Sequence, residues 1–172
     1  FGYYRFDRGE VAGVQALGAR YGEMDMTRVG IYGWSFGGYF AAMATCRRPD
    51  VFHAAIAGAP VIDWEDYDTH YTERYMGLPQ DNPEGYKKCS VLTYAEGLSR
   101  PLLLIHGTTD DNVYFVHTLK MAEALFRAGK PCDLLVLPGF THMVPDPLIS
   151  TRLYGRIMSF LAEHLQSQAA SN

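Results

Sequence analysis

The feature that most constrains this chain is a serine between two glycines, in the sequence Gly-Trp-Ser-Phe-Gly at residues 33–37. The run RVGIYG at 28–33 predicts a buried strand before it, and the Ala-, Phe- and Met-rich segment 36–48 predicts a helix that stops at Pro49. A serine in such a strand–turn–helix connection lies on a strained turn, and Gly33 and Gly37 are expected to be small so that strand and helix can approach. The motif therefore predicts that Ser35 is a nucleophile and not merely a helix-capping serine.

The rest of the chain alternates between the two kinds of element. Further strands are expected at 52–58, 101–106 and 133–137, and further helices at 10–21, 113–128 and 148–166. Strands that are almost continuously apolar are typical of parallel sheets covered on both faces. The sequence therefore predicts an α/β fold with a parallel sheet of about four strands and helices on both faces.

Composition excludes several classes of protein. With 48% hydrophobic and 20% charged residues the chain is globular, and a net charge of −4 without a Lys/Arg block argues against a nucleic-acid partner. No apolar run approaches the roughly 20 residues of a membrane helix. Cys46, Cys89 and Cys132 lack metal-ligand or disulfide-scaffold spacing. We therefore expect no metal, no cofactor and no membrane segment, and the sequence indicates no compartment.

A serine nucleophile needs a base to take its proton and an acid to orient that base. In parallel sheets such residues follow the carboxyl ends of strands. His142 follows the last predicted strand, whereas His106 ends an apolar strand and the remaining histidines lie on helices or away from the converging loops. We therefore expect His142 to be the base.

The acid is expected directly after the third predicted strand. Asp110 and Asp111 both lie there, which gives the order Ser, Asp, His of α/β hydrolases. Their spacing leaves open which one faces His142, and the other is expected in an Asx turn or a helix cap. The backbone N–H of Phe36, directly after the nucleophile, is the expected first donor to the oxyanion.

Three strings resemble one family closely. GWSFGGY around Ser35, WEDYDTHYTERYMGLP from Trp64 and HGTTDDNV from His106 are similar to the prolyl oligopeptidase family of serine peptidases, in its dipeptidyl peptidase IV-like subfamily. The resemblance covers essentially the whole chain, and it implies the C-terminal half of an α/β-hydrolase fold. It assigns the acid's role to Asp110.

The resemblance also gives a role to an aromatic stretch. Trp64, Tyr67, Tyr71 and Tyr75 are spaced as one face of a helix, a pattern that usually packs into a core. In the family, the matching positions wall a flat pocket for proline or alanine, and the position of Asn112 holds the substrate carbonyl. The implied pocket residues are Phe36, Val61, Trp64, Tyr67, Tyr71 and Val113.

The resemblance implies a peptidase that releases N-terminal dipeptides after a penultimate Pro or Ala through an acyl-enzyme. Its partners would be such peptides, and a homodimer is implied to which helix 148–166 would contribute. Two alternatives stay open: an acylaminoacyl-peptidase-like or esterase-like hydrolase, and a non-catalytic binding or assembly module. The residues around the base, Thr141-His142-Met143, depart from the Asp-His-Gly of many relatives.

Family members are much longer than this chain. They carry an N-terminal β-propeller with acidic residues for the substrate amine, and an upstream tyrosine that supplies the second oxyanion donor. Residues 1–172 are therefore expected to be part of a catalytic domain, with Phe1 an internal position and weak peptidase activity at best in isolation. Tyr3 and Tyr4 follow the position of that tyrosine and are not assigned its role.

Overall fold

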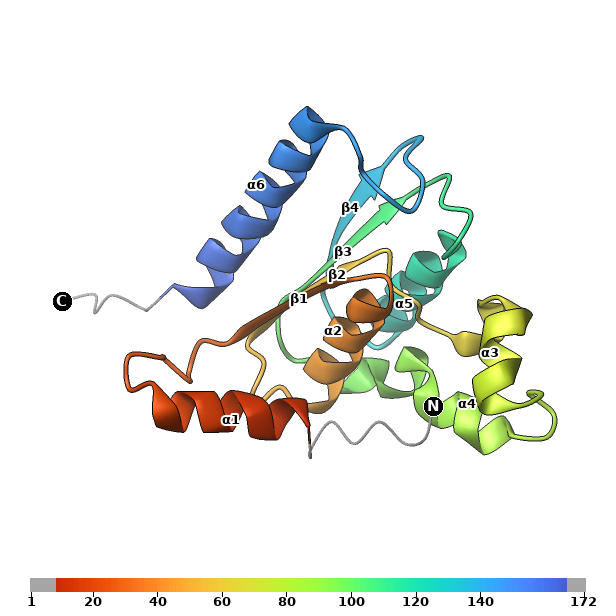
Figure 1. Cartoon of the computed structure of the whole chain (residues 1–172), viewed down its shortest axis with the longest axis horizontal. Helices are drawn as coiled ribbons and strands as arrows, with labels where there is room; N and C mark the ends of the chain where they lie inside the picture. Colours follow the sequence, from red (N-terminus) through yellow and green to blue (C-terminus); the bar gives the residue numbers. More distant parts are fainter. Residues whose placement is uncertain (1–8, 167–172) are drawn as a thin grey trace.

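The computed structural model describes residues 9–166. Figure 1 shows its helices and strands in chain order. The elements are α1 (Glu10–Arg20), β1 (Gly30–Trp34), α2 (Phe36–Arg47), β2 (Ala54–Gly58), η1 (Trp64–Asp66), α3 (Thr69–Met76), α4 (Pro83–Cys89), η2 (Val91–Gly97), β3 (Leu102–Gly107), α5 (Val116–Arg127), β4 (Asp133–Leu137) and α6 (Pro147–Leu165). Every predicted strand and helix is present, with ends shifted by a few residues.

The four strands form one parallel sheet in the order β1-β2-β3-β4. Strands that follow one another in the chain are therefore neighbours in the sheet, and each crosses over through helical segments. All four carboxyl ends lie at one edge, so the loops that leave them converge there. The predicted parallel α/β sheet is confirmed.

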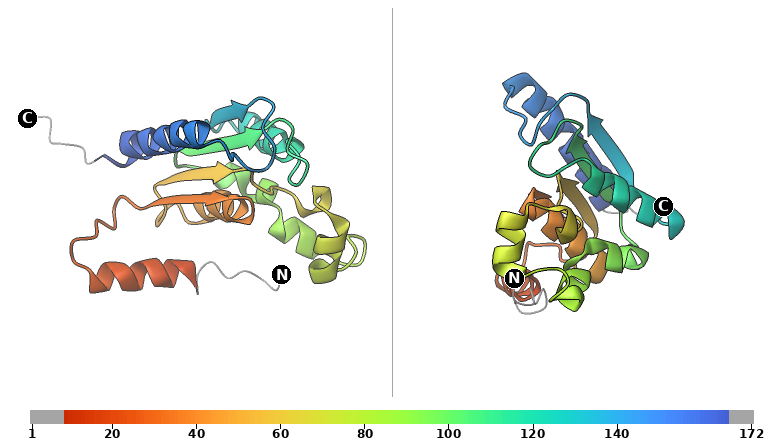
Figure 2. Two further views of the ribbon diagram at one scale, coloured as in Figure 1. Left: turned by 45° about the horizontal axis from the view of Figure 1, so that its top comes forward. Right: turned by 90° about the vertical axis from the view of Figure 1, so that its right-hand side faces the viewer.

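The two faces of the sheet carry separate apolar clusters. Along β2 and β3 alternate side chains enter one cluster or the other, as the two-residue period of a strand requires. The larger cluster includes Ala55, Leu102 and Leu104 with residues of α2 and α5, and the smaller includes Ile56 and residues of α6. Figures 1 and 2 show α6 on one side of the sheet and α2 with α5 on the other.

The aromatic stretch departs from the prediction of a single helix. Residues 64–66 form the short helix η1, and α3 begins only at Thr69. Each start has its own aspartate: Asp63 accepts the N–H of Glu65, and Asp68 accepts the N–H groups of His70 and Tyr71. Two caps five residues apart favour two helix starts over one continuous helix.

The sheet ends at β1 on one side and at β4 on the other within the described residues. On β1 the side chain of Tyr32 is 40% exposed, and its ring meets Tyr154 of α6 edge-on with 6.4 Å between centroids. Between residues 9 and 166, no helix combines the length and apolar character needed to cross a bilayer.

Candidate active site

Ser35 lies on the turn between β1 and α2 in a conformation that few non-glycine residues adopt. Its φ is 59° and its ψ is −119°, and its side chain makes no capping hydrogen bond to the helix. The backbone holds it instead: the Ser35 N–H donates to Gly58 O at 2.8 Å, and the Ser35 carbonyl accepts the Tyr39 N–H at 3.0 Å. The hydroxyl is therefore not used to cap α2, and the turn has the strain expected of a nucleophile position.

Close approach of strand and helix depends on Gly33 and Gly38, whereas Gly33 and Gly37 were expected. A Cβ added to Gly33 would overlap the Gly37 backbone, and one added to Gly38 would overlap the Gly58 carbonyl. A Cβ added to Gly37 would meet nothing within 4 Å outside its own helical turn. The expectation that Gly37 must be small is therefore wrong, because its Cα–Cβ direction points away from the strand that approaches its backbone.

The predicted acid and the predicted base are in direct contact. His142 Nδ1 lies 2.8 Å from Asp110 Oδ2, and Asp110 is only 4% exposed. The other oxygen, Oδ1, accepts the N–H groups of Asn112 at 3.0 Å and Val113 at 2.9 Å. Asp110 thus makes the Asx turn that was expected of the other aspartate, while Asp111 is exposed.

This turn also explains a shorter helix. The predicted helix 113–128 begins only at Val116, because the Val113 N–H is bound to Asp110 and the Val113 carbonyl accepts from His106 Nε2 at 2.8 Å. The first residues after the strand are committed to orienting the carboxylate instead of extending the helix.

The loops after β3 and β4 are fastened to each other. The Thr108 N–H donates to Leu137 O at 3.1 Å, the Thr109 N–H donates to Phe140 O at 3.1 Å, and the Gly139 N–H donates to Thr108 Oγ1 at 2.9 Å. A Cβ on Gly107 would overlap the Phe140 carbonyl. The backbones that carry the acid and the base therefore lie against each other at a distance that leaves no room for a side chain.

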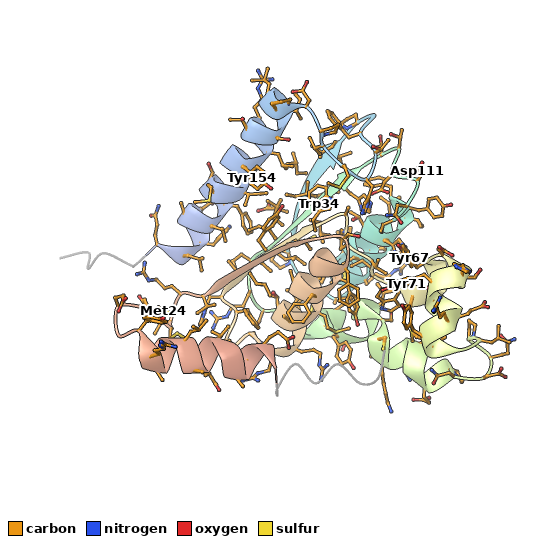
Figure 3. All side chains as sticks on the ribbon, in the orientation of Figure 1. Met24, Trp34, Tyr67, Tyr71, Asp111 and Tyr154 are labelled. Atoms are coloured by element: carbon orange, nitrogen blue, oxygen red, sulfur yellow. The ribbon has the colours of Figure 1, made fainter. Side chains whose placement is uncertain are left out.

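Trp34, which precedes Ser35, bonds the loop of the predicted base to the serine turn. The Trp34 indole N–H donates to the His142 backbone oxygen at 2.8 Å. Figure 3 labels Trp34 at the end of β1. Among the described residues Ser35 Oγ makes no hydrogen bond to the His142 ring. Such bonds are often formed only in the complex with substrate.

The aromatic residues form one continuous cluster even though they do not share a helix. The Trp64 ring lies 5.9 Å from Phe36, 5.6 Å from Tyr67 and 6.2 Å from Tyr71, centroid to centroid. Tyr67 and Tyr71 meet edge-on at 5.6 Å and lie next to each other in Figure 3. Trp64 is buried, and Tyr71 is 36% exposed. The cluster therefore runs from the core to the surface.

The remaining expected pocket residues connect this cluster to the acid loop. The Tyr67 hydroxyl donates to Asn112 Oδ1 at 2.9 Å, so the aromatic cluster is bonded to the turn that holds Asp110. Val61 and Val113 are buried in the same apolar cluster as Trp64. Phe36 is the first residue of α2, so its amide belongs to the helical turn that follows Ser35. Tyr3 and Tyr4 lie outside the described residues.

Two contacts were not predicted from sequence. His106 lies fully buried beside Asp110, and Trp34 bonds the base loop. An imidazole at the end of an otherwise apolar strand must find hydrogen-bond partners, which was the available signal for His106. For Trp34 no sequence signal existed, because its partner is a backbone oxygen 108 positions away.

Within residues 9–166, no group of three or more His, Cys, Asp or Glu side chains is arranged to hold a metal ion.

The chain is similar to two known dipeptidyl peptidases. The chain is 47% identical over 165 residues to human dipeptidyl peptidase 8, which covers 94% of this chain and 18% of that protein. It is 38% identical over 148 residues to pig dipeptidyl peptidase 4, which covers 84% of this chain and 19% of that protein. The chain thus spans about a fifth of the length of these relatives.

A solved structure gives the same result for the fold. Dipeptidyl peptidase 4 of Porphyromonas gingivalis superposes with a TM-score of 0.86 at 40% identity, over 91% of this chain and 22% of that one. The fold is therefore the expected C-terminal part of an α/β hydrolase. Residues 9–168 match the model of the prolyl oligopeptidase family, and the chain belongs to that family.

Proposed function

We propose that this chain carries the catalytic residues of a serine peptidase that releases N-terminal dipeptides after a penultimate Pro or Ala. The observation that carries the proposal is the 2.8 Å contact of His142 with the buried Asp110, at the strand edge where Ser35 occupies its strained turn. Similarity to dipeptidyl peptidases 8 and 4 supports the substrate class.

In the proposed reaction Ser35 Oγ attacks the carbonyl carbon of the scissile bond while His142 Nε2 takes its proton. The carbonyl oxygen becomes an alkoxide, and the Phe36 N–H donates to it. His142 then gives the proton to the leaving amine, and the acyl-enzyme remains on Ser35. A water molecule, deprotonated by His142, hydrolyses that ester and restores Ser35. Throughout, Asp110 orients the imidazole and stabilises its charged form.

The aromatic cluster supports a preference for a small, rigid residue before the scissile bond. Trp64, Tyr67 and Tyr71 contact one another through ring faces and edges, so the apolar surface that they form is proposed to be rigid. A proline ring or an alanine methyl group gains apolar contact there, whereas a charged side chain would lose its hydration. Asn112, held by Tyr67, is proposed to donate its amide to the substrate carbonyl.

We further propose that these residues act as part of a longer polypeptide and that peptides are its partners. The exposure of Tyr32 on the edge strand β1 and the share of about a fifth of the relatives' length support this view. The upstream part would supply the second oxyanion donor and the acidic groups for the substrate amine. A homodimer involving α6 remains part of the same proposal.

The proposal is tested with three substrates on the full-length polypeptide: a Gly-Pro chromogenic amide, an acyl-amino-acid amide and a short-chain ester. We expect Gly-Pro turnover. Ser35→Ala should lose both turnover and labelling by a fluorophosphonate. Ester turnover without Gly-Pro turnover would indicate the esterase-like alternative, and a correctly folded protein without labelling would indicate a binding module.

A further inference from the structure

The acid of the site is in contact with two imidazoles, only one of which the proposed reaction uses. The second belongs to His106, which is fully buried at the carboxyl end of β3. Its Nε2 lies 3.3 Å from Asp110 Oδ2, the same oxygen that meets His142 Nδ1. The carboxylate oxygen of Asp110 therefore lies between two rings.

The hydrogen bonds of His106 define its tautomer. Nε2 lies 2.8 Å from the Val113 backbone oxygen, which can only accept, so Nε2 carries the proton. Nδ1 lies 2.7 Å from Thr118 Oγ1 on α5. Burial lowers the pKa of His106, against the opposing effects of the Val113 carbonyl and the Asp110 carboxylate. The ring is thus neutral at pH 7, and Nδ1 accepts the Thr118 hydroxyl proton.

The charged and titratable groups around His106 come from three elements. Asp110 follows its own strand, His142 follows β4, and His117 lies on α5. The Phe115 ring covers the imidazole edge-on at 5.6 Å between centroids. Asp110 is the only carboxylate among these groups in the described structure, so the His106 N–H acts on the acid of the site and on no competing anion.

We propose that His106 is a positioning residue for the peptidase reaction: its Nε2–H holds the Val113 carbonyl and faces Asp110 Oδ2, which fixes the carboxylate toward His142. The proposal rests on the proposed function and deepens it. Oδ1 is fixed by the Asn112 and Val113 N–H groups, and the Val113 carbonyl in the same turn accepts from His106 Nε2. Without His106, the turn would lose the donor to its Val113 carbonyl, and Oδ2 would lose the dipole that faces it.

Matched variants separate positioning from packing. The amide nitrogen of Gln reaches about as far as His Nε2, so His106→Gln keeps a donor toward Val113 and Asp110. The shorter His106→Asn places its amide near the former Nδ1 and loses that donor. Thr118→Val removes only the partner of Nδ1. All three remove a buried hydrogen bond or change packing, and each is checked for folding by thermal unfolding.

The variants are made in the full-length polypeptide and assayed for kcat and KM on the Gly-Pro amide from pH 5 to 8.5, and for the rate of fluorophosphonate labelling. For His106→Asn we expect kcat and labelling to fall about tenfold or more with KM little changed, because a misdirected base weakens proton transfer. The acidic limb of its kcat profile should move to higher pH, since a partner dipole of Asp110 is gone. His106→Gln should recover most of the rate and the original limb, and Thr118→Val should lose stability but keep kcat.

Equal losses in His106→Gln and His106→Asn that follow their thermal stability, with an unchanged pH profile, would overturn the proposal in favour of packing alone. Failure of the proposed substrate is a separate result: wild type would be labelled on Ser35 without cleaving Gly-Pro, and the labelling rates would still compare the variants. Absence of labelling in folded wild type would overturn both proposals.

Discussion

The steric basis of the nucleophile turn can be tested with two alanine substitutions four residues apart. In Gly33→Ala the new Cβ would stand 2.7 Å from the Gly37 Cα and closer still to its carbonyl. Carbon atoms in contact need about 3.5–4.0 Å, so β1 and the first turn of α2 must separate by about 1 Å. Overpacking of this kind costs about 1–3 kcal/mol of unfolding free energy. A displacement of about 1 Å at a catalytic group costs about 100-fold in rate.

Gly37→Ala is the matched control. Its Cβ meets nothing within 4 Å outside its own turn, and it replaces glycine by alanine inside a helix. The expected result is an increase of up to about 1 kcal/mol in unfolding free energy. Urea unfolding measures the stabilities, and fluorophosphonate labelling of Ser35 measures the rates. Wild-type labelling and stability in Gly33→Ala, or a loss in Gly37→Ala as large as in Gly33→Ala, would refute the steric argument.

Three further outcomes are expected. Burial lowers the pKa of His117 to about 4, from an ordinary 6.5 in the unfolded chain. As the pH falls, the unfolded state therefore takes up the proton first. The free energy of unfolding should be highest above pH 6.5 and fall by about 3 kcal/mol toward pH 4, as urea titrations across that range would show. His117→Asn should flatten this slope. Tyr67→Phe removes the 2.9 Å bond to Asn112 and should raise KM for Gly-Pro amides about fivefold, whereas an unchanged KM would show that substrate binding does not depend on this bond. Trp34→Phe removes the indole donor to the His142 backbone and should slow labelling about tenfold. Labelling at the wild-type rate would show that the loop of His142 keeps its position without this hydrogen bond.

Much of the fold could be predicted because its signals are local. Apolar runs such as PLLLIH at 101–106 lie within two residues of the observed strands, and Pro49 marks the end of α2 closely. Where prediction failed, two local signals competed. The spacing of Trp64 and Tyr71 suits one helix, but the capping aspartates 63 and 68 start two. Spacing describes which residues can share a face, whereas caps determine where a helix begins.

The site was less accessible from sequence because its contacts are distant. That Asp110 and not Asp111 meets His142 depends on the path of the loop, which spacing leaves open. The Asp110 carboxylate has one oxygen in the turn and one toward His142, whereas the sequence predicts these two roles for two different aspartates. The position of His106 at the end of an apolar strand gives no indication of its contact with Asp110, which is visible only in three dimensions.

The fastening of the two loops after β3 and β4 has a consequence for how this scaffold could be redesigned or could diverge. The Gly139 N–H donates to Thr108 Oγ1, the Thr108 N–H donates to Leu137 O, and Gly107 admits no side chain beside Phe140. An insertion in one loop would therefore shift the other, and the acid would move with the base. Chimeras between relatives are expected to work when both loops come from the same parent and to fail when they come from different ones. In recombination experiments the two loops should therefore be exchanged together.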